Sequence, residues 1–274
     1  MRVRVGTAGW SIASQYAEAF PAEGMGLERY AARLSCAEIN SSFYRPHRAS
    51  TWTRWGELVP RDFRFSVKVP RSITYERRLS DCRELVARLL EETAGLGEKL
   101  AIFLVQLPPT LIYDANVADL FFAELGAATP AYIACEPRHR SWFEPAADDL
   151  LVRHRVARVA ADPARIPVAA DPGGWRGLTY WRLHGSPQMY SSAYGSRELD
   201  SYAERIAVER EKPAWCVFDN TASSAALGNA LALESRLAGK RTGTLGQPVA
   251  LVGLAGLPLR YLVAQRRFGV KPRA

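Results

Sequence analysis

The side chains best suited to chemistry in this sequence stand at the ends of short apolar runs. Four of them suit proton transfer: Lys68, Glu136, His184 and Asp219. Carboxylates and imidazoles serve as general acids and bases, and a lysine ammonium neutralises phosphate or carboxylate charge. We expect Glu136 or Asp219 to act as the general base and His184 or His139 as the acid. The substrate would be a small anion that is hydrolysed or isomerised.

A second set of polar and aromatic residues lies near the same run ends and would bind the substrate. Arginine, amide and imidazole groups would hold its charged part, and aromatic rings would form an apolar wall. The set is Trp10, Asn40, Tyr44, Gln106, Arg138, His139, Trp142, Arg182 and Asn220. A purely structural interpretation stays open for part of it. Glu136 would then form an ion pair with Arg138 or Arg182, and Asp219-Asn220 would cap the last helix.

Metal ligands and cofactor motifs are sparse. The histidines are His47, His139, His154 and His184, with no HExxH motif or paired spacing, which disfavours a site of several zinc ions. A single Mg²⁺ or Mn²⁺ on Glu136, Asp162 and Asp219 remains an alternative. The sequence GTAGW at 6–10 lacks the spacing of a dinucleotide fingerprint, and no G-x-S-x-G nucleophile elbow is present. No nucleotide cofactor is therefore predicted.

Eight apolar runs of strand length alternate with helical stretches and carry these side chains. The runs are 3–6, 37–40, 63–69, 101–107, 131–136, 156–162, 179–184 and 215–220. The clearest helical stretches are 27–34, 81–93, 114–125, 146–154, 200–210 and 223–237, with Asp81 and Asp114 as N-caps. This order requires parallel strands with crossovers, so an open doubly wound α/β sheet competes with a closed (β/α)₈ TIM-like barrel. The number of runs and the missing fingerprint favour the barrel.

Residues alternate between the two faces of a strand, and active sites of parallel barrels lie at the carboxyl ends of their strands. The alternation directs Arg64, Ser66 and Lys68 inward from one strand. It directs Tyr180, Arg182 and His184 inward from another, and Glu136 inward from a third. The polar run ends should therefore meet in one pocket. A buried Lys or Arg costs several kcal/mol unless it is paired, so these cations require carboxylates or a bound anion.

Composition sets the broad class and the domain boundary. The 274 residues are 48% hydrophobic and carry a net charge of +8, which excludes a disordered chain. Residues 239–274 hold seven lysines and arginines and no acid, which leaves +1 for residues 1–238. We predict a barrel at 1–238 and a short basic and apolar C-terminal extension at 239–274. The nearly neutral charge of residues 1–238 disfavours broad nucleic-acid binding by the barrel.

The predicted cellular compartment rests on the cysteine spacing and on the lack of a signal peptide or a membrane span in the sequence. Cys36, Cys82, Cys135 and Cys216 are far apart and form no CxxC pair. We find no signal peptide, and no run of ~18 apolar residues that would span a membrane. We expect a cytoplasmic protein without membrane contact, and its oligomeric state is left open.

Seven short motifs, in chain order, resemble the YecE-like family, a TIM-barrel family called domain of unknown function 72. They are GTAGW at 6–10, EINSSFYRP at 38–46, FSVK at 65–68, QLPP at 106–109, EPRHRSW at 136–142, YWRLHG at 180–185 and FDNT at 218–221. The resemblance covers about residues 2–237 and implies the barrel, but no activity. Thr74-Tyr75 stands where relatives often have Thr-His. This chain therefore lacks that histidine, and we assign no acid–base or metal role to Tyr75 in its place. The fold is similar to sugar isomerases and to abasic-site endonucleases, whose multi-zinc chemistry the few histidines disfavour.

Three functions remain open. We favour an enzyme, of hydrolase or isomerase type, that acts on a small anion such as a phosphate- or nucleotide-bearing molecule. The alternative is a non-catalytic module that captures an anion or a nucleic-acid end, with Trp10, Tyr44, Trp142 and Tyr190 stacking on bases. In the third, the polar ring only stabilises the fold.

Overall fold

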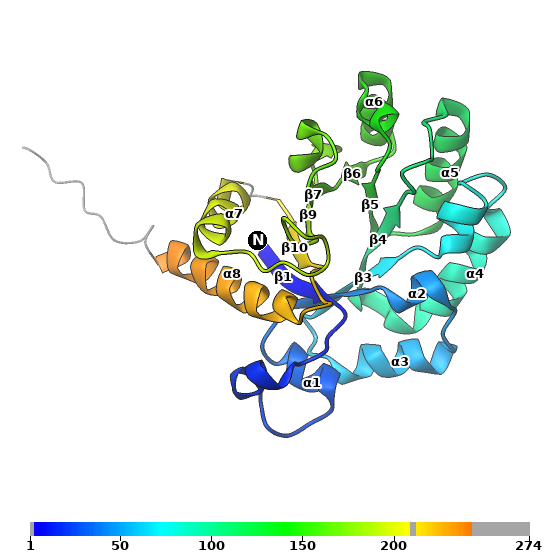
Figure 1. The fold of residues 1–274 in the computed structure, drawn as a ribbon. Coiled ribbons are helices and arrows are strands. Elements are labelled where there is room, and N and C mark those ends of the chain that lie inside the picture. The colour runs from blue at the N-terminus through cyan, green and yellow to red at the C-terminus, as the bar shows by residue number, and fades with distance from the viewer. Residues whose placement is uncertain (1–2, 209–211, 243–274) are drawn as a thin grey trace, which may run out of the picture.

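The computed structural model describes residues 3–208 and 212–242 and has a nearly closed barrel of mostly parallel strands. Figure 1 shows the helices around the outside of these strands. The strands are β1 Val3–Ala8, β2 Cys36–Ile39, β3 Arg64–Lys68, β4 Leu100–Gln106, β5 Tyr132–Glu136, β6 Val156–Arg158, β7 Ala160–Asp162, β8 Gly173–Gly174, β9 Thr179–Leu183 and β10 Ala214–Phe218.

The helices lie mainly between consecutive strands. They are α1 Gly26–Ala31, α2 Ser41–Tyr44, α3 Ala49–Leu58, α4 Arg83–Thr93, α5 Ala115–Ala128, α6 Pro145–Arg153, α7 Ser196–Val208 and α8 Ala225–Thr242. Short 3₁₀ segments cover Ser14–Ala19, Ala94–Lys99, Arg140–Phe143 and Pro167–Ala170, and one π-helical turn covers Ser72–Glu76. The predicted strand–helix alternation is confirmed.

The strand order is β7-β9-β10-β1-β2-β3-β4-β5-β6-β8. β6 and β7 are separated only by Val159. β7 is the first strand of this order, and β6 lies next to its other end, where β8 is the last strand. β6 pairs in parallel with β5, and β7 pairs in parallel with β9, so the predicted run 156–162 bridges the two ends of the sheet. This split strand nearly closes the barrel, and β8 adds a short antiparallel pair to β6.

The barrel interior has an apolar part and a polar part. Alternate residues of the strands, among them Ile102, Leu104 and Val217, form a small apolar cluster inside the ring. Phe65 and Val67 of β3 belong instead to the larger core that includes the helices. The intervening Ser66 and Lys68 therefore face inward, as the alternation predicts. Polar side chains at the carboxyl ends of the strands complete the interior.

Two local predictions about helix starts have different outcomes. Asp114 caps α5, because its carboxylate accepts the backbone N–H groups of Asn116 and Val117. The prediction for Asp81 is wrong: α4 has Cys82 as its N-cap residue, and Asp81 has φ +51°. A residue in that left-handed conformation lacks the extended backbone of a typical N-cap.

The sequence did not indicate α3, which contains Ser, two Thr, two Trp and Gly, all weak helix formers. Tertiary packing stabilises it, since Trp52 is fully buried in the core.

The end of the described chain lies beyond the predicted boundary at 238, because α8 runs on to Thr242. The rest of the predicted extension, residues 243–274, lies outside the described residues. Cys36, Cys82, Cys135 and Cys216 are buried free thiols. None of the described helices combines the length and apolarity that crossing a bilayer requires.

Candidate active site

Arg182 of β9 is the centre of a buried ion network at the carboxyl ends of the strands. Its guanidinium lies 2.7 Å from Glu38 Oε1, 3.0 Å from Glu136 Oε2 and 2.9 Å from Asp219 Oδ2. Burial lowers the pKa of Arg182, but the Asp219, Glu38 and Glu136 carboxylates raise it well above its ordinary value. Arg182 is fully buried, and such a cation is tolerated only with close partners. It therefore ties together β2, β5, β9 and the end of β10.

Glu38 accepts hydrogen bonds from two residues of this network, Arg182 and Tyr180. Two bonds from Arg182 Nε reach its carboxylate, at 3.2 and 3.1 Å, and the Tyr180 hydroxyl donates to Oε2 at 2.7 Å. The same hydroxyl lies 3.1 Å from Ser66 Oγ. Burial, reinforced by Glu38, raises the pKa of Tyr180 well above its ordinary value, so the phenol stays a donor. We did not predict Glu38 as a site residue, although its inward position at the end of β2 was a usable signal.

His184 and Asp219 form a second pair, directly after β9 and β10. His184 Nδ1 lies 3.0 Å from Asp219 Oδ2, and Asn40 Nδ2 donates to Asp219 Oδ1 at 3.4 Å. Burial lowers the pKa of His184, but Glu136 and the Asp219 hydrogen bond raise it above its ordinary value. Burial likewise raises the pKa of Asp219, but Arg182 and His184 hold it below the usual range. The pair is therefore an imidazolium–carboxylate pair at mildly acidic pH.

Glu136 is surrounded by donors. Its Oε1 accepts from Gln106 Nε2 at 2.9 Å and from Arg138 Nε at 3.0 Å, while Oε2 faces Arg182. Burial raises the pKa of Glu136, but Arg182, His184 and Arg138 lower it well below its usual range. An ionised carboxylate with this many donors orients its neighbours and is a weak base.

Lys68 differs from every other charge in this cluster. It is 6% exposed, and its Nζ lies 4.1 Å from the centre of the Phe43 ring. No residue in 3–208 or 212–242 forms a hydrogen bond or ion pair with its ammonium. Burial, aided by Arg182 and opposed by the three carboxylates, lowers the pKa of Lys68 to about 8. A lysine with that pKa can exchange a proton near neutral pH.

The charges of the cluster do not cancel. Within the described residues, three carboxylates (Glu38, Glu136 and Asp219) face three paired cations (Arg138, Arg182 and His184). Lys68 is left over as one positive charge in a nearly water-free position. An uncompensated buried charge is costly, so this end of the barrel is predisposed to an anion.

Three predicted binding residues lie outside the cluster. Trp142 is buried, and its Nε1 donates to Leu111 O at 3.0 Å. His139 Nδ1 lies 2.8 Å from Ser141 Oγ and caps the following 3₁₀ segment. Asn220 Nδ2 donates to Ser192 O at 2.9 Å. In each case the chain has left the barrel after the strand end, so strand alternation no longer directs the side chain inward.

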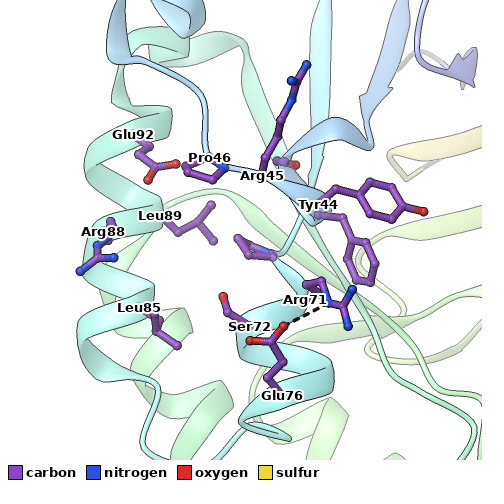
Figure 2. A pocket seen from close by; sticks show the side chains of 13 residues that line it. Tyr44, Arg45, Pro46, Arg71, Ser72, Glu76, Leu85, Arg88, Leu89 and Glu92 are labelled. Carbon is purple, nitrogen blue, oxygen red and sulfur yellow. Dashed lines mark ion pairs between the residues drawn. The ribbon is translucent and has the colours of Figure 1, made fainter.

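Two predicted aromatic residues also stand apart. Trp10 packs edge-to-face on Trp55, with ring centres 5.1 Å apart. Tyr44 is 71% exposed and lines a cleft of about 280 Å³ between α2, the π-helical turn and α4. Figure 2 shows this cleft, with the Arg71–Glu76 ion pair at its edge. Phe43, whose ring contacts the Lys68 ammonium, also lines this cleft.

The metal alternative is not supported by the arrangement of its three carboxylates. Asp162 Oδ2 accepts from the Tyr194 hydroxyl at 2.7 Å, whereas Glu136 and Asp219 both face Arg182. Across the part of the chain that the structure describes, no group of three or more His, Cys, Asp or Glu side chains is placed to hold a metal ion.

Comparisons with known proteins agree with this barrel. The family model described as "Protein of unknown function DUF72" matches residues 4–251. The chain is 33% identical to the UPF0759 protein YecE of Escherichia coli K12 over 84 residues, 31% of each chain. It is 27% identical to the UPF0759 protein YunF of Bacillus subtilis over 151 residues, 52% of this chain and 53% of that one. The matched regions thus span about a third to a half of these relatives.

Solved structures match over more of the chain. A DUF72 family protein of Thermotoga maritima superposes with a TM-score of 0.71 at 23% identity, covering 87% of this chain and 100% of that one. A xylose isomerase-like TIM barrel/4-hydroxyphenylpyruvate dioxygenase fusion protein gives a TM-score of 0.50 at 15% identity, covering 92% of this chain and 46% of that one. At these identities the likeness shows the fold alone.

Proposed function

The chain belongs to the DUF72 family of proteins of unknown function, and from the geometry of its barrel we propose an enzyme of isomerase or hydrolase type. It acts on a small anionic substrate at the carboxyl ends of the strands. The observation that carries this proposal is Lys68, a buried ammonium that pairs with no carboxylate of residues 3–208 or 212–242, beside Arg138, Arg182 and His184, which are all paired. A bound phosphate or carboxylate would supply the missing negative charge.

Lys68 and Asp219 have the properties of the proton-transfer groups. Lys68, with a pKa of about 8, is a stronger acid than an ordinary lysine and donates to an oxygen on which negative charge develops. Asp219 is the most exposed of the three carboxylates, at 7%. Among the described residues, the hydrogen-bond contact of its Oδ1 is the long one from Asn40 Nδ2, at 3.4 Å. This oxygen accepts the proton that leaves a substrate C–H or an attacking water. The two protons return through solvent, so each catalytic group is restored.

Arg182 and Glu136 have a different part in this proposal from the one that the sequence suggested. Arg182 is saturated by three carboxylates, so it holds the site together and does not bind the substrate. Glu136, held ionised, fixes Arg138 through the 3.0 Å bond to Nε. Arg138 is thereby positioned as the second cation for the substrate.

A second candidate, anion binding without turnover, has one observation in its favour. Both Asp219 and Glu136 have pKa values below their usual ranges, and a carboxylate with a low pKa is a weak base. The same group of residues would then hold an anion and leave it chemically unchanged.

The experiment that separates these functions combines binding and turnover. Wild type, Lys68→Met, Asp219→Asn and the control Lys99→Met are titrated with inorganic phosphate and tested on small phosphorylated and carboxylated hydroxycarbonyl compounds in D₂O. We expect wild type and Lys99→Met to bind phosphate and to catalyse exchange or conversion of one compound class. Lys68→Met should lose binding, and Asp219→Asn should keep binding but lose about 100-fold or more in rate.

Two outcomes contradict the enzyme. Phosphate binding that depends on Lys68, without turnover of any compound, establishes the binding module instead. Phosphate binding that is unchanged in Lys68→Met overturns the anion site itself.

A further inference from the structure

A small cavity lies beside the ion network, on the side of the barrel opposite Lys68's neighbour Phe43. It measures about 20 Å³, which is room for one water-sized atom. Its charged lining residues are Glu136, Arg138, Arg165 and His184, and the cis Asp162–Pro163 bond begins the loop that carries Arg165. The cavity therefore brings the end of β5, the end of β9 and the loop after β7 to one point.

His184 presents to this cavity a donor nitrogen that has only a long contact with Glu136 among the described residues. The side chain is 1% exposed, and its Nδ1 is occupied by Asp219. Its Nε2 lies 3.3 Å from Glu136 Oε1 but, within the described part of the chain, has no partner in hydrogen-bond geometry. Leaving a buried N–H without an acceptor costs about 1–3 kcal/mol. A ligand oxygen in the cavity would accept from it.

The lining of the cavity is positively charged overall. Arg138, Arg165 and protonated His184 line the cavity together with the single carboxylate of Glu136, which already accepts from Gln106, Arg138 and Arg182. Arg165 is exposed and forms no hydrogen bond or ion pair with residues 3–208 or 212–242. Its guanidinium is therefore available to an anion, and Arg side chains bind carboxylate and phosphate oxygens in pairs.

We propose that this cavity binds one oxygen of a second anionic group of the substrate, held by His184, Arg138 and Arg165. This inference rests on the function proposed above and specifies its substrate class. One anionic group faces Lys68, and the other faces Arg165, with the Glu136 carboxylate between them. The substrate is thus a small molecule with two anionic groups, and Arg165 is a residue that determines its specificity.

The test uses inorganic phosphate and two matched series of organic anions. The dicarboxylates are succinate, glutarate and adipate, and the monocarboxylates are straight-chain acids of the same lengths. Calorimetry gives the affinities, and the side-chain NMR signal of Lys68 reports on its own site. We expect one dicarboxylate to bind wild type about ten-fold tighter than its monocarboxylate, a difference of about 1.4 kcal/mol.

Arg165→Gln should abolish that ten-fold preference and leave the response of the Lys68 signal to phosphate intact. Arg140→Gln is the matched control, because Arg140 is an exposed arginine of the neighbouring loop that does not line the cavity. It should keep the preference.

Equal affinity for both series in wild type, or a preference that survives in Arg165→Gln, overturns the second anion subsite while the phosphate response still supports the proposed function. If no anion moves the Lys68 signal, the proposed function fails and this inference fails with it.

Discussion

Lys68 Nζ lies 4.1 Å from the centre of the Phe43 ring, and within 3–208 and 212–242 no carboxylate pairs with it. The ring face attracts the ammonium by about 0.5–2 kcal/mol, which stabilises the charge less than water or a carboxylate does. The three nearby carboxylates all face Arg182. The folded protein therefore contains one buried cation that lowers its free energy of unfolding.

Replacing Lys68 by Met should stabilise the protein at neutral pH. Folding lowers the pKa of Lys68 from 10.5 to about 8, so below pH 8 the protonated side chain opposes folding by about 3 kcal/mol. Allowing for the lost contact with Phe43, we expect a gain of about 1–3 kcal/mol at pH 7.

The sign of the pH dependence follows from proton binding. Between pH 8 and 10.5 the unfolded chain binds more protons at Lys68, so wild-type stability rises with pH and the advantage of Lys68→Met shrinks. Denaturant unfolding of wild type and Lys68→Met at several pH values measures the stability gain of the variant and the change of that gain with pH. Lys99→Met is the control, and it should destabilise, because Lys99 Nζ donates to the carbonyls of Gly56 and Val59. A Lys68→Met variant less stable than wild type at pH 7 contradicts this account.

Arg182→Met should be among the most destabilising substitutions in the barrel. It leaves the buried carboxylates of Glu38, Glu136 and Asp219 without their shared cation, and breaking such buried pairs costs about 3–5 kcal/mol. Arg138→Met removes a cation that contacts one carboxylate at the rim and should cost only about 1–3 kcal/mol. Urea unfolding of both variants tests the order, and equal losses argue against Arg182 as the centre of the network.

The His184–Asp219 pair should confer stability in a limited pH window. Folding raises the pKa of His184 above 6.5, so its contribution is fully present below pH 6.5 and is lost as the pH rises through the folded value. Folding lowers the pKa of Asp219 below 3.8, so its contribution is present above that pH and is lost as the pH falls through the folded value.

The free energy of unfolding of wild type minus that of His184→Gln should therefore be largest between about pH 5 and 6.5 and should decline at higher pH. Denaturant titrations across this range check it. A difference that grows above pH 7 would show that the imidazole is stabilised in its neutral form.

The number of strand-length runs and the family resemblance predicted the barrel, and strand alternation predicted most of its interior charges. Alternation placed Lys68, Arg182 and Glu136 on the inward face, and the structure brings them together with Asp219, which was predicted only from its place at a run end. The alternation works because backbone geometry alone sends successive side chains to opposite faces of a strand.

Beyond the strand ends the sequence carried less information. His139, Trp142 and Asn220 lie in segments where loop conformation sets the direction of the side chain. His139 bonds locally to Ser141, whereas Trp142 and Asn220 bond to the distant carbonyls of Leu111 and Ser192. The ion pairs could not be predicted either, because they depend on three-dimensional distances. Among the described residues, Glu38, Glu136 and Asp219 pair with Arg182 and not with Lys68. Glu38 was missed for a different reason, since its inward position at the end of β2 was a signal that the sequence did contain.

The most direct test measures the pKa of Lys68 in the intact protein. The chain has only five lysines, at 68, 99, 212, 240 and 271, so isotope-labelled lysine gives few side-chain NMR signals, and Lys68→Met assigns the relevant one. We predict a titration near pH 8 in the free protein and an upward shift when inorganic phosphate is added, because a bound anion favours the ammonium. Titration at the ordinary lysine value of 10.5, unmoved by phosphate, would contradict the claim that this barrel holds an unpaired cation for an anionic substrate.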